Sequence, residues 1–282
     1  MSRNSKLISP TAHYTGQVWF RNGLSDRRLS TLQGKVFYQT LKPMMQASAR
    51  MGGPTLEGFL LARHQLIDLQ LEQAISCGEV SQVIEVAAGL SPRGLRMKKK
   101  FGEKLTYIEA DLPAMAALKA KKLSLTTTGS HRVFAIDALQ DHGPHSLSYL
   151  CDGLRQNEGT ALITEGLLNY FPQHAVEVLW NRFASALGRF PSGLYLSDLH
   201  LKPSNNSPLV AAFLAGLSAF VAGKVQLHYE DDESCLSALG VAGFETAELL
   251  KPAQWAHLLE SCAAPGANLV SIVKAQCSRR AN

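Results

Sequence analysis

The middle of the chain alternates short apolar runs with amphipathic segments. Five runs are strand-sized and rich in β-branched or aromatic residues, at 83–87, 105–108, 133–136, 161–164 and 194–196. The segments between them, at 92–101, 113–123, 146–156 and 173–188, have helical character. Strands and helices in alternation predict an α/β fold, with a parallel sheet, right-handed crossovers and helices on both faces.

The flanking regions follow other patterns. Apolar residues recur near a 3.6-residue period over 54–75, and Pro54-Thr55 and Gly78 bound a predicted helix there. Residues 244–249 and 269–274 would complete the sheet, with a helix over 252–262 between them. The alternation pauses over 201–234, where an apolar stripe at 209–221 precedes an acidic run at 230–233. We expect an N-terminal helical extension (1–80) and one domain (81–282) with a lid insertion (201–234).

Composition excludes several classes of protein. With 46% apolar and 18% charged residues among 282, the chain is globular rather than disordered or a coiled coil. The net charge is +5, but its basic runs lack interleaved aromatics, so no nucleic-acid partner is expected. The longest apolar stretch, 209–223, is shorter than the ~20 residues of a membrane helix, so no membrane partner is expected.

The cysteines and the N-terminus indicate the compartment. Five cysteines are widely spread without a C-x-x-C pair, which suits a reducing environment and argues against disulfides or a zinc site. No secretory signal is evident near residue 1. We therefore expect a cytoplasmic protein with no metal, and the oligomeric state stays open.

Acidic residues recur where the predicted strands end. Glu85 lies late in the first strand, and Asp111, Asp137 and Glu165 follow the next three. Any one of them alone is more simply a helix cap or a solvated turn. Because ligands of open α/β sheets bind outside the carboxyl ends of the strands, four in corresponding places favour a site.

The turn after the first strand suggests a nucleoside ligand. Ala87 replaces the first glycine of a dinucleotide fingerprint, whereas Gly89 still permits close backbone approach. Asp111 lies about 20 residues on, where an acidic side chain accepts ribose hydroxyls. A pyrophosphate would be repelled by several carboxylates, so the cationic methyl donor S-adenosyl-L-methionine fits better than a nicotinamide cofactor. A nicotinamide-dependent oxidoreductase and a non-enzymatic donor-binding or interaction protein remain the alternatives.

Several segments together resemble the leucine carboxyl methyltransferase family. Residues 83–96 are similar to its first motif, and 107–113 with Leu118-Lys119 to its second. Residues 163–170 resemble its E-G-x-x-x-Y segment, and Arg63 to Asp68 its R-x-x-x-x-D helix. These similarities span most of the chain in the right order. They imply an S-adenosyl-L-methionine-dependent O-methyltransferase, acting on a small-molecule or carboxyl-terminal acceptor.

The resemblance also implies a fold and roles for residues. The fold would be Rossmann-like, a seven-stranded, mainly parallel sheet whose last strand inserts antiparallel. The donor-binding residues expected are Arg63 at the carboxylate, Gly89 at the methionine part, Asp111 at the ribose, Asp137 and Ala138 at the adenine, Glu165 near the ammonium, and Glu85. Ala12-His13 stands where phosphatase-directed members carry Lys-Arg, which makes a phosphatase tail a poor acceptor.

No catalytic residue is assigned from the sequence. Tyr170 and His200 are candidates to line the acceptor pocket, and His64 lies beside Arg63. A lone histidine is more often packed or solvated than a base, and none of these groups has an adjacent carboxylate partner in the sequence. A carboxylic acid is already ionised at neutral pH and needs no base. The sequence therefore favours a carboxylate acceptor held under the 201–234 segment.

Overall fold

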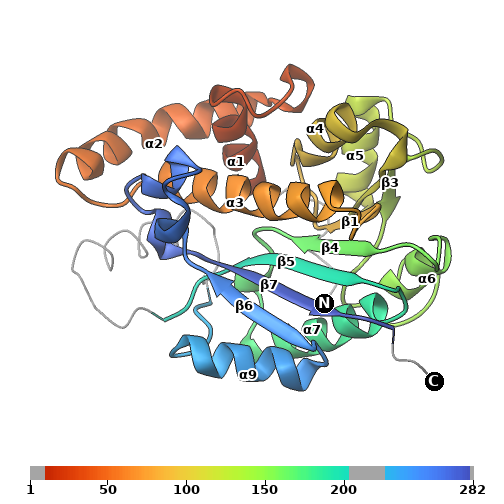
Figure 1. Ribbon diagram of the computed structural model, residues 1–282. Coiled ribbons are helices and arrows are strands. Elements are labelled where there is room, and N and C mark those ends of the chain that lie inside the picture. Colours follow the sequence, from red (N-terminus) through yellow and green to blue (C-terminus); the bar gives the residue numbers. More distant parts are fainter. Residues whose placement is uncertain (1–9, 203–225, 280–282) are drawn as a thin grey trace.

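A seven-stranded sheet organises the computed structural model, which describes residues 10–202 and 226–279 (Figure 1). The strand order is β3-β2-β1-β4-β5-β7-β6. Strands β1 to β5 pair in parallel, and β7 lies antiparallel between β5 and β6. The bounds are β1 Gln82–Val86, β2 Thr106–Asp111, β3 His131–Ala135, β4 Thr160–Thr164, β5 Gly193–Leu199, β6 Thr246–Leu250 and β7 Ser271–Cys277. The predicted sheet, including its inserted antiparallel strand, is confirmed.

Helices cover both faces of the sheet. Helices α3 (Leu56–Ser76), α4 (Arg93–Phe101) and α5 (Pro113–Leu123) lie on one face, and α6 (Leu147–Asp152), α7 (Gln173–Leu187) and α9 (Asp232–Ala242) on the other. Alternate residues of each central strand therefore point into two separate cores: Val83 faces α3, and Ile84 faces α7. The central strands are buried on both sides, which explains why they read as continuous apolar runs.

The N-terminal extension consists of helices that pack on the domain. It comprises α1 (Pro10–Arg21), α2 (Leu32–Arg50) and α3, with Thr31 and Thr55 accepting hydrogen bonds as N-caps of α2 and α3. The helix predicted over 54–75 is confirmed as α3. Its residues Leu66 and Leu71 share one core with strand residues of the sheet.

One prediction about the C-terminal third is wrong. The helix expected over 252–262 is instead two short 3₁₀ turns, η4 (Pro252–Trp255) and η5 (Glu260–Ala263), with η6 (Ala267–Leu269) following. The chain becomes extended at Leu259, which lets Trp255 and Cys262 both pack against the core on the α3 face. The acidic run at 230–233 begins α9, because the Asp231 carboxylate accepts from the Ser234 amide at 2.8 Å.

Residues 203–225 of the predicted lid, including the stripe at 209–221, lie outside the described residues. Within the two described segments, no helix has both the length and the apolar character needed to cross a bilayer.

Candidate functional site

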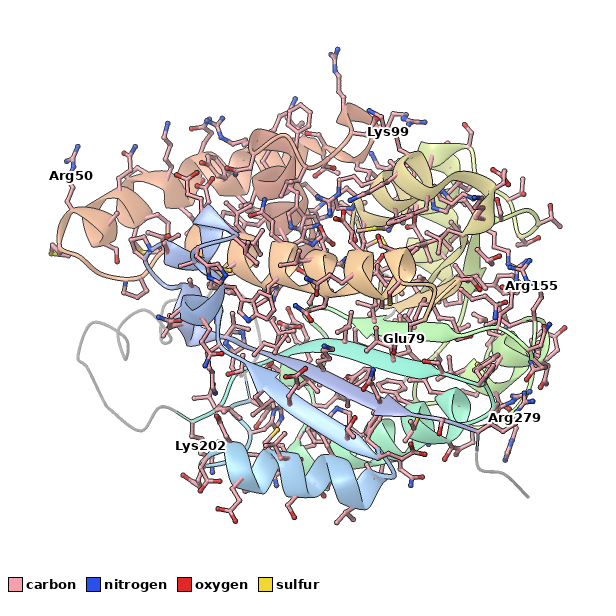
Figure 2. All side chains as sticks on the ribbon, in the orientation of Figure 1. Arg50, Glu79, Lys99, Arg155, Lys202 and Arg279 are labelled. Atoms are coloured by element: carbon pink, nitrogen blue, oxygen red, sulfur yellow. The ribbon has the colours of Figure 1, made fainter. Side chains whose placement is uncertain are left out.

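The carboxyl ends of the parallel strands carry most of the predicted site residues. Asp111 ends β2, Asp137 follows β3 by two residues, and Glu165 follows β4 directly. Lys202, just beyond β5, marks this edge in Figure 2, and Arg155 and Arg279 mark the opposite edge. Thr11 on α1 hydrogen-bonds Tyr170 after β4, so the N-terminal helix reaches the same edge.

The turn after β1 is built around two left-handed residues. Ala87 has φ 55° and Gly89 has φ 47°. The Gly89 amide donates to Oδ2 of Asp111 at 2.7 Å, and the Leu112 amide donates to Oδ1 of the same carboxylate at 2.7 Å. Burial raises the pKa of Asp111, although these two amides oppose the shift. Gly89 and Asp111, which the sequence together associated with a nucleoside ligand, are thus in direct contact. The contact holds the Asp111 carboxylate beside the turn.

Replacing Ala87 with glycine is expected to stabilise the fold. A left-handed conformation costs a residue with a Cβ about 1 kcal/mol, and glycine adopts it freely. Part of that gain is offset by the greater freedom of glycine in the unfolded chain, so we expect Ala87→Gly to raise Tm by about 1–2 °C. Thermal denaturation measures it, with Ala88→Gly as the control. Ala88 has no positive φ, so that variant should lower Tm, and a lower Tm for Ala87→Gly would contradict the strain argument.

Arg63 lies at the end of β4 and β5 and is held by two carboxylates. Its Nε donates to Glu165 at 3.0 Å and its Nη1 to Asp198 at 2.8 Å. The Gly166 amide donates to the other oxygen of Asp198 at 2.6 Å. A Cβ on Gly166, whose φ is +68°, would stand 3.0 Å from Nη2 of Arg63. The absence of a side chain at residue 166 therefore leaves room beside Nη2 of Arg63, whose side chain is otherwise buried and held by the two carboxylates.

Arg93, which the sequence did not single out, lies among the predicted acidic residues. It is fully buried at the start of α4, where its three guanidinium nitrogens contact Asp68 at 2.6 Å, Glu85 at 2.5 Å and Glu165 at 2.6 Å. Burial alone would lower the pKa of Arg93, but these carboxylates raise it well above its ordinary value. A signal was present in the sequence: a cation in the first turn of a helix opposes the helix dipole and needs acidic partners.

The same contacts decide the state of Glu165. Its oxygens accept from Arg63, Arg93 and, at 2.7 Å, interact with Nδ1 of His64. Burial would raise the pKa of Glu165, yet His64 and the two guanidinium groups hold it well below its usual range. Glu165 is therefore an anion with several partners. Glu85 lies inside β1, where it accepts hydrogen bonds from Arg93 and from the Tyr107 hydroxyl.

Asp137 and Ala138 lie beyond β3. The Asp137 carboxylate accepts from the Leu139 amide at 2.9 Å, which closes a tight turn. The Ala138 carbonyl accepts from Arg182 of α7 at 3.1 Å, which fixes the backbone there. The preceding Ile136 amide donates to the Asp111 carbonyl at 2.9 Å, so this turn lies next to the end of β2.

The two acceptor-pocket candidates lie in different surroundings. Tyr170, in η3 (Leu168–Tyr170), is 44% exposed and its hydroxyl lies 2.8 Å from that of Thr11. His200 is buried, with Nδ1 2.7 Å from the Leu269 carbonyl and its ring edge-on to Phe59. Burial lowers the pKa of His200. His64 is fully buried, with its ring tilted against Trp19 at 4.5 Å between centroids and its Nδ1 on Glu165.

Two further observations on the described residues bear on where a functional site lies. A groove of about 760 Å³ lies at the amino ends of the strands, between α7, α9 and β7, and includes Asn181, Gly243 and Arg279. It holds no converging set of ionic groups like that around Arg63 and Arg93. Across 10–202 and 226–279, no group of three or more His, Cys, Asp or Glu is arranged to hold a metal ion.

Sequence comparison relates this chain to one family. A model of the leucine carboxyl methyltransferase family matches residues 22–184, more than half of the chain. A Rhodococcus jostii protein assigned as an S-adenosyl-L-methionine-dependent methyltransferase is 33% identical over 47% of this chain and 44% of its own. A Parafrankia protein with the same assignment is 30% identical over 63% and 59%. The chain thus spans about half the length of these curated relatives.

Solved structures share the fold at low identity. A Thermobifida fusca protein assigned as a methyltransferase superposes with a TM-score of 0.65, at 14% identity, over 98% of this chain and 96% of its own. Human N-acetylserotonin methyltransferase, solved with S-adenosylmethionine, gives a TM-score of 0.52 at 13% identity over 96% and 67%. The predicted Rossmann-like fold is confirmed, and with the match over residues 22–184 the chain belongs to the leucine carboxyl methyltransferase family.

Proposed function

We propose that the protein is an S-adenosyl-L-methionine-dependent O-methyltransferase. Two features at one edge of the sheet carry the proposal. One is a carboxylate held by the turn that contains a glycine, placed where it could accept ribose hydroxyls. The other is a guanidinium with room for an anion beside one of its nitrogens. Asp111 and Gly89 make the first, and Arg63 beside Gly166 makes the second. A donor with a nucleoside at one end and an amino-acid carboxylate at the other matches both.

The residues present fit this donor. A Cβ on Gly166 would cover Nη2 of Arg63, so residue 166 leaves a cradle for an anionic group. A planar guanidinium fixed by Glu165 and Asp198 binds a carboxylate with well-defined geometry. Asp111, with both oxygens already oriented by amides, would accept the ribose hydroxyls, and Asp137 and Ala138 would lie against the adenine. Glu165 would lie near the donor ammonium, and Glu85 contributes through Arg93.

When bound, the donor supplies a methyl group on a sulfonium, and transfer is an in-line displacement. The protein's contribution is to align the acceptor and to exclude water. Arg63, Gly89 and Asp111 orient the donor, and the described end of α1 shields the edge through Thr11 and Tyr170. These groups bind and orient, and none of them needs to transfer a proton.

The acceptor we propose is a carboxylate, either of a small molecule or at a carboxyl terminus. A carboxylate is ionised at neutral pH, so its oxygen needs no general base. His200 fits this view, because its Nδ1 lies on a carbonyl and its ring is packed on Phe59. Tyr170 and His200 would then line the acceptor side. In this proposal the protein works in the cytoplasm, without a nucleic-acid or membrane partner.

Ligand binding and product chemistry test the proposal together. We expect calorimetry to show binding of S-adenosylhomocysteine, and no comparable binding of NADH. With a methyl-labelled donor and a carboxylic-acid library, the label should enter an ester that mild alkali cleaves. Tight NADH binding would favour the oxidoreductase instead, and an alkali-stable product would overturn the carboxylate acceptor. Donor binding without turnover on any acceptor would support a binding protein.

A further inference from the structure

A buried ionic network, formed by Lys119, Glu109 and His131, contacts the turn at residues 87–89 that is assigned to the donor. Lys119 on α5 is only 1% exposed, and its ammonium makes a short contact with Oε2 of Glu109 in the middle of β2. The same ammonium donates to the Ala88 carbonyl at 3.2 Å. The other oxygen of Glu109 lies 2.7 Å from Nε2 of His131 on β3. This ionic network thus links the turn after β1 to α5, β2 and β3.

The glycine at position 94 leaves room for this ionic network. A Cβ on Gly94, in the first turn of α4, would stand 2.3 Å from Oε1 of Glu109 and 2.8 Å from Nε2 of His131. The helix that presents Arg93 therefore approaches the sheet directly over the Glu109–His131 pair. Any larger residue at position 94 would push either α4 or the pair away.

A gain in folding stability does not by itself explain why this ionic network is buried. A buried ion pair gains little over apolar residues of similar volume, because both charges lose their hydration. Burial would raise the pKa of Glu109, but Lys119 and His131 lower it, so the carboxylate stays charged. Lys119 also contacts a backbone carbonyl whose position matters: Ala88 stands between the two left-handed residues, Ala87 and Gly89.

Four hydrogen bonds hold the turn. The Ala88 amide donates to the Ala110 carbonyl at 3.2 Å and the Gly89 amide to Asp111, so two contacts come from β2 and its end. The Ala88 carbonyl accepts from the Ser91 amide at 2.9 Å and from Lys119 at 3.2 Å. Lys119 is the contact from α5 and, of the four, the only one made by a charged donor.

We propose that Lys119 is a positioning residue for methyl-donor binding: its ammonium fixes the Ala88 carbonyl and thereby the geometry of the 87–89 turn, while Glu109 and His131 hold Lys119 in place. This inference rests on the proposed function, since it assigns the turn to the donor. Lys119 itself does not touch the donor. Its effect is on how Gly89 meets the methionine part and how Asp111 meets the ribose.

The test removes both buried charges at once. In Lys119→Met/Glu109→Gln no unpaired charge is left, so the variant should fold, with a Tm within a few degrees of wild type. Its affinity for S-adenosylhomocysteine, measured by calorimetry, should fall about tenfold, since a hydrogen bond from a charged group is lost at the turn. Affinity for 5′-methylthioadenosine should fall less, because that ligand lacks the amino-acid part that Gly89 would contact.

Lys122→Met is the matched control. Lys122 is on the same helix and also donates to a backbone carbonyl, that of Arg28 at 2.9 Å, away from the donor turn. Its affinity for S-adenosylhomocysteine should equal that of wild type. If the double variant fails to fold, Lys119→Arg keeps the charge opposite Glu109 but presents its donors in another geometry, and it should fold with weakened binding.

The outcomes separate the two proposals. Wild-type affinity in a folded Lys119→Met/Glu109→Gln or Lys119→Arg variant overturns the positioning role and leaves the proposed function intact. A fall in Tm with unchanged affinity assigns a purely structural role to Lys119. Failure of the wild-type protein to bind S-adenosylhomocysteine overturns the proposed function, and the positioning role falls with it.

Discussion

Arg93→Met is expected to destabilise the protein by about 3–5 kcal/mol, because it removes one charged partner from each of three buried carboxylates. Asp68, Glu85 and Glu165 all contact this guanidinium, and methionine fills part of its volume without its charge. The expected fall in Tm at neutral pH is on the order of 10 °C. Thermal denaturation followed by circular dichroism measures it.

The pH dependence identifies the cause. In the wild type the pKa values of Asp68 and Glu165 are lowered, so the stability they contribute is present above about pH 4 and is lost as the pH falls further. His64 lowers both pKa values along with Arg93, so without Arg93 the pKa values should lie higher than in the wild type, and the variant should lose less stability on acidification. The Tm difference between variant and wild type should therefore shrink from pH 7 to pH 5.

Arg96→Met is the control for Arg93→Met. Arg96 also contacts Asp68, but its side chain is 26% exposed and Asp68 keeps Arg93. We expect a loss of about 1 kcal/mol or less. Equal losses for the two variants, or a Tm difference that does not change with pH, would show that the carboxylates around Arg93 do not depend on it.

Asp111→Ala is expected to lower the affinity for S-adenosylmethionine at least tenfold. Hydrogen bonds to a charged group are worth about 1.5–3 kcal/mol, and the substitution also removes the acceptor of the Gly89 and Leu112 amides. Calorimetry on the folded variant measures the loss. Asp141→Ala is a suitable control, because Asp141 is an exposed residue paired with Arg182. Unchanged affinity in Asp111→Ala would remove Asp111 from the donor site.

Acidification of the wild type gives a second measurement of the same residue. Burial raises the pKa of Asp111, so its carboxylate should take up a proton at a higher pH than an exposed aspartate does. Since the proposed contact needs an acceptor, donor affinity should fall as the pH drops through this raised value. The pKa of Glu165 is held well below its usual range, so Glu165 stays ionised as Asp111 takes up its proton and does not cause this fall.

The sheet could be predicted because its signals are local. Each central strand is a short apolar run bounded by turn residues, and Asp111, Asp137 and Glu165 follow strand ends directly. The 3₁₀ turns after β6 could not be separated from a helix, because their apolar residues recur at similar intervals. Their conformation is decided by packing on the α3 side of the sheet, which the local sequence does not contain.

The ionic contacts of the site were harder to predict. Asp198 occupies the same place in β5 as the predicted acids do in their strands, and its position could have indicated it. The ion pairs of Arg93 and Lys119 could not be predicted, because their partners lie on other elements. These pairs form only when α3, α4, α5 and β2 come together in the fold. Arg63 was predicted for the donor, whereas its two carboxylate partners became visible only in the structure.

The insertion of β7 between β5 and β6 has a consequence for biosynthesis. Strands β1 to β5 can pair as they emerge from the ribosome, but the free edge of β5 acquires its partner only when residues 271–277 have been made. Until then β5, buried on both faces in the finished protein, presents unpaired backbone groups to other chains. Release of a nascent chain that stops before β7 would therefore yield an aggregation-prone product, even though every proposed donor-binding residue had already been synthesised.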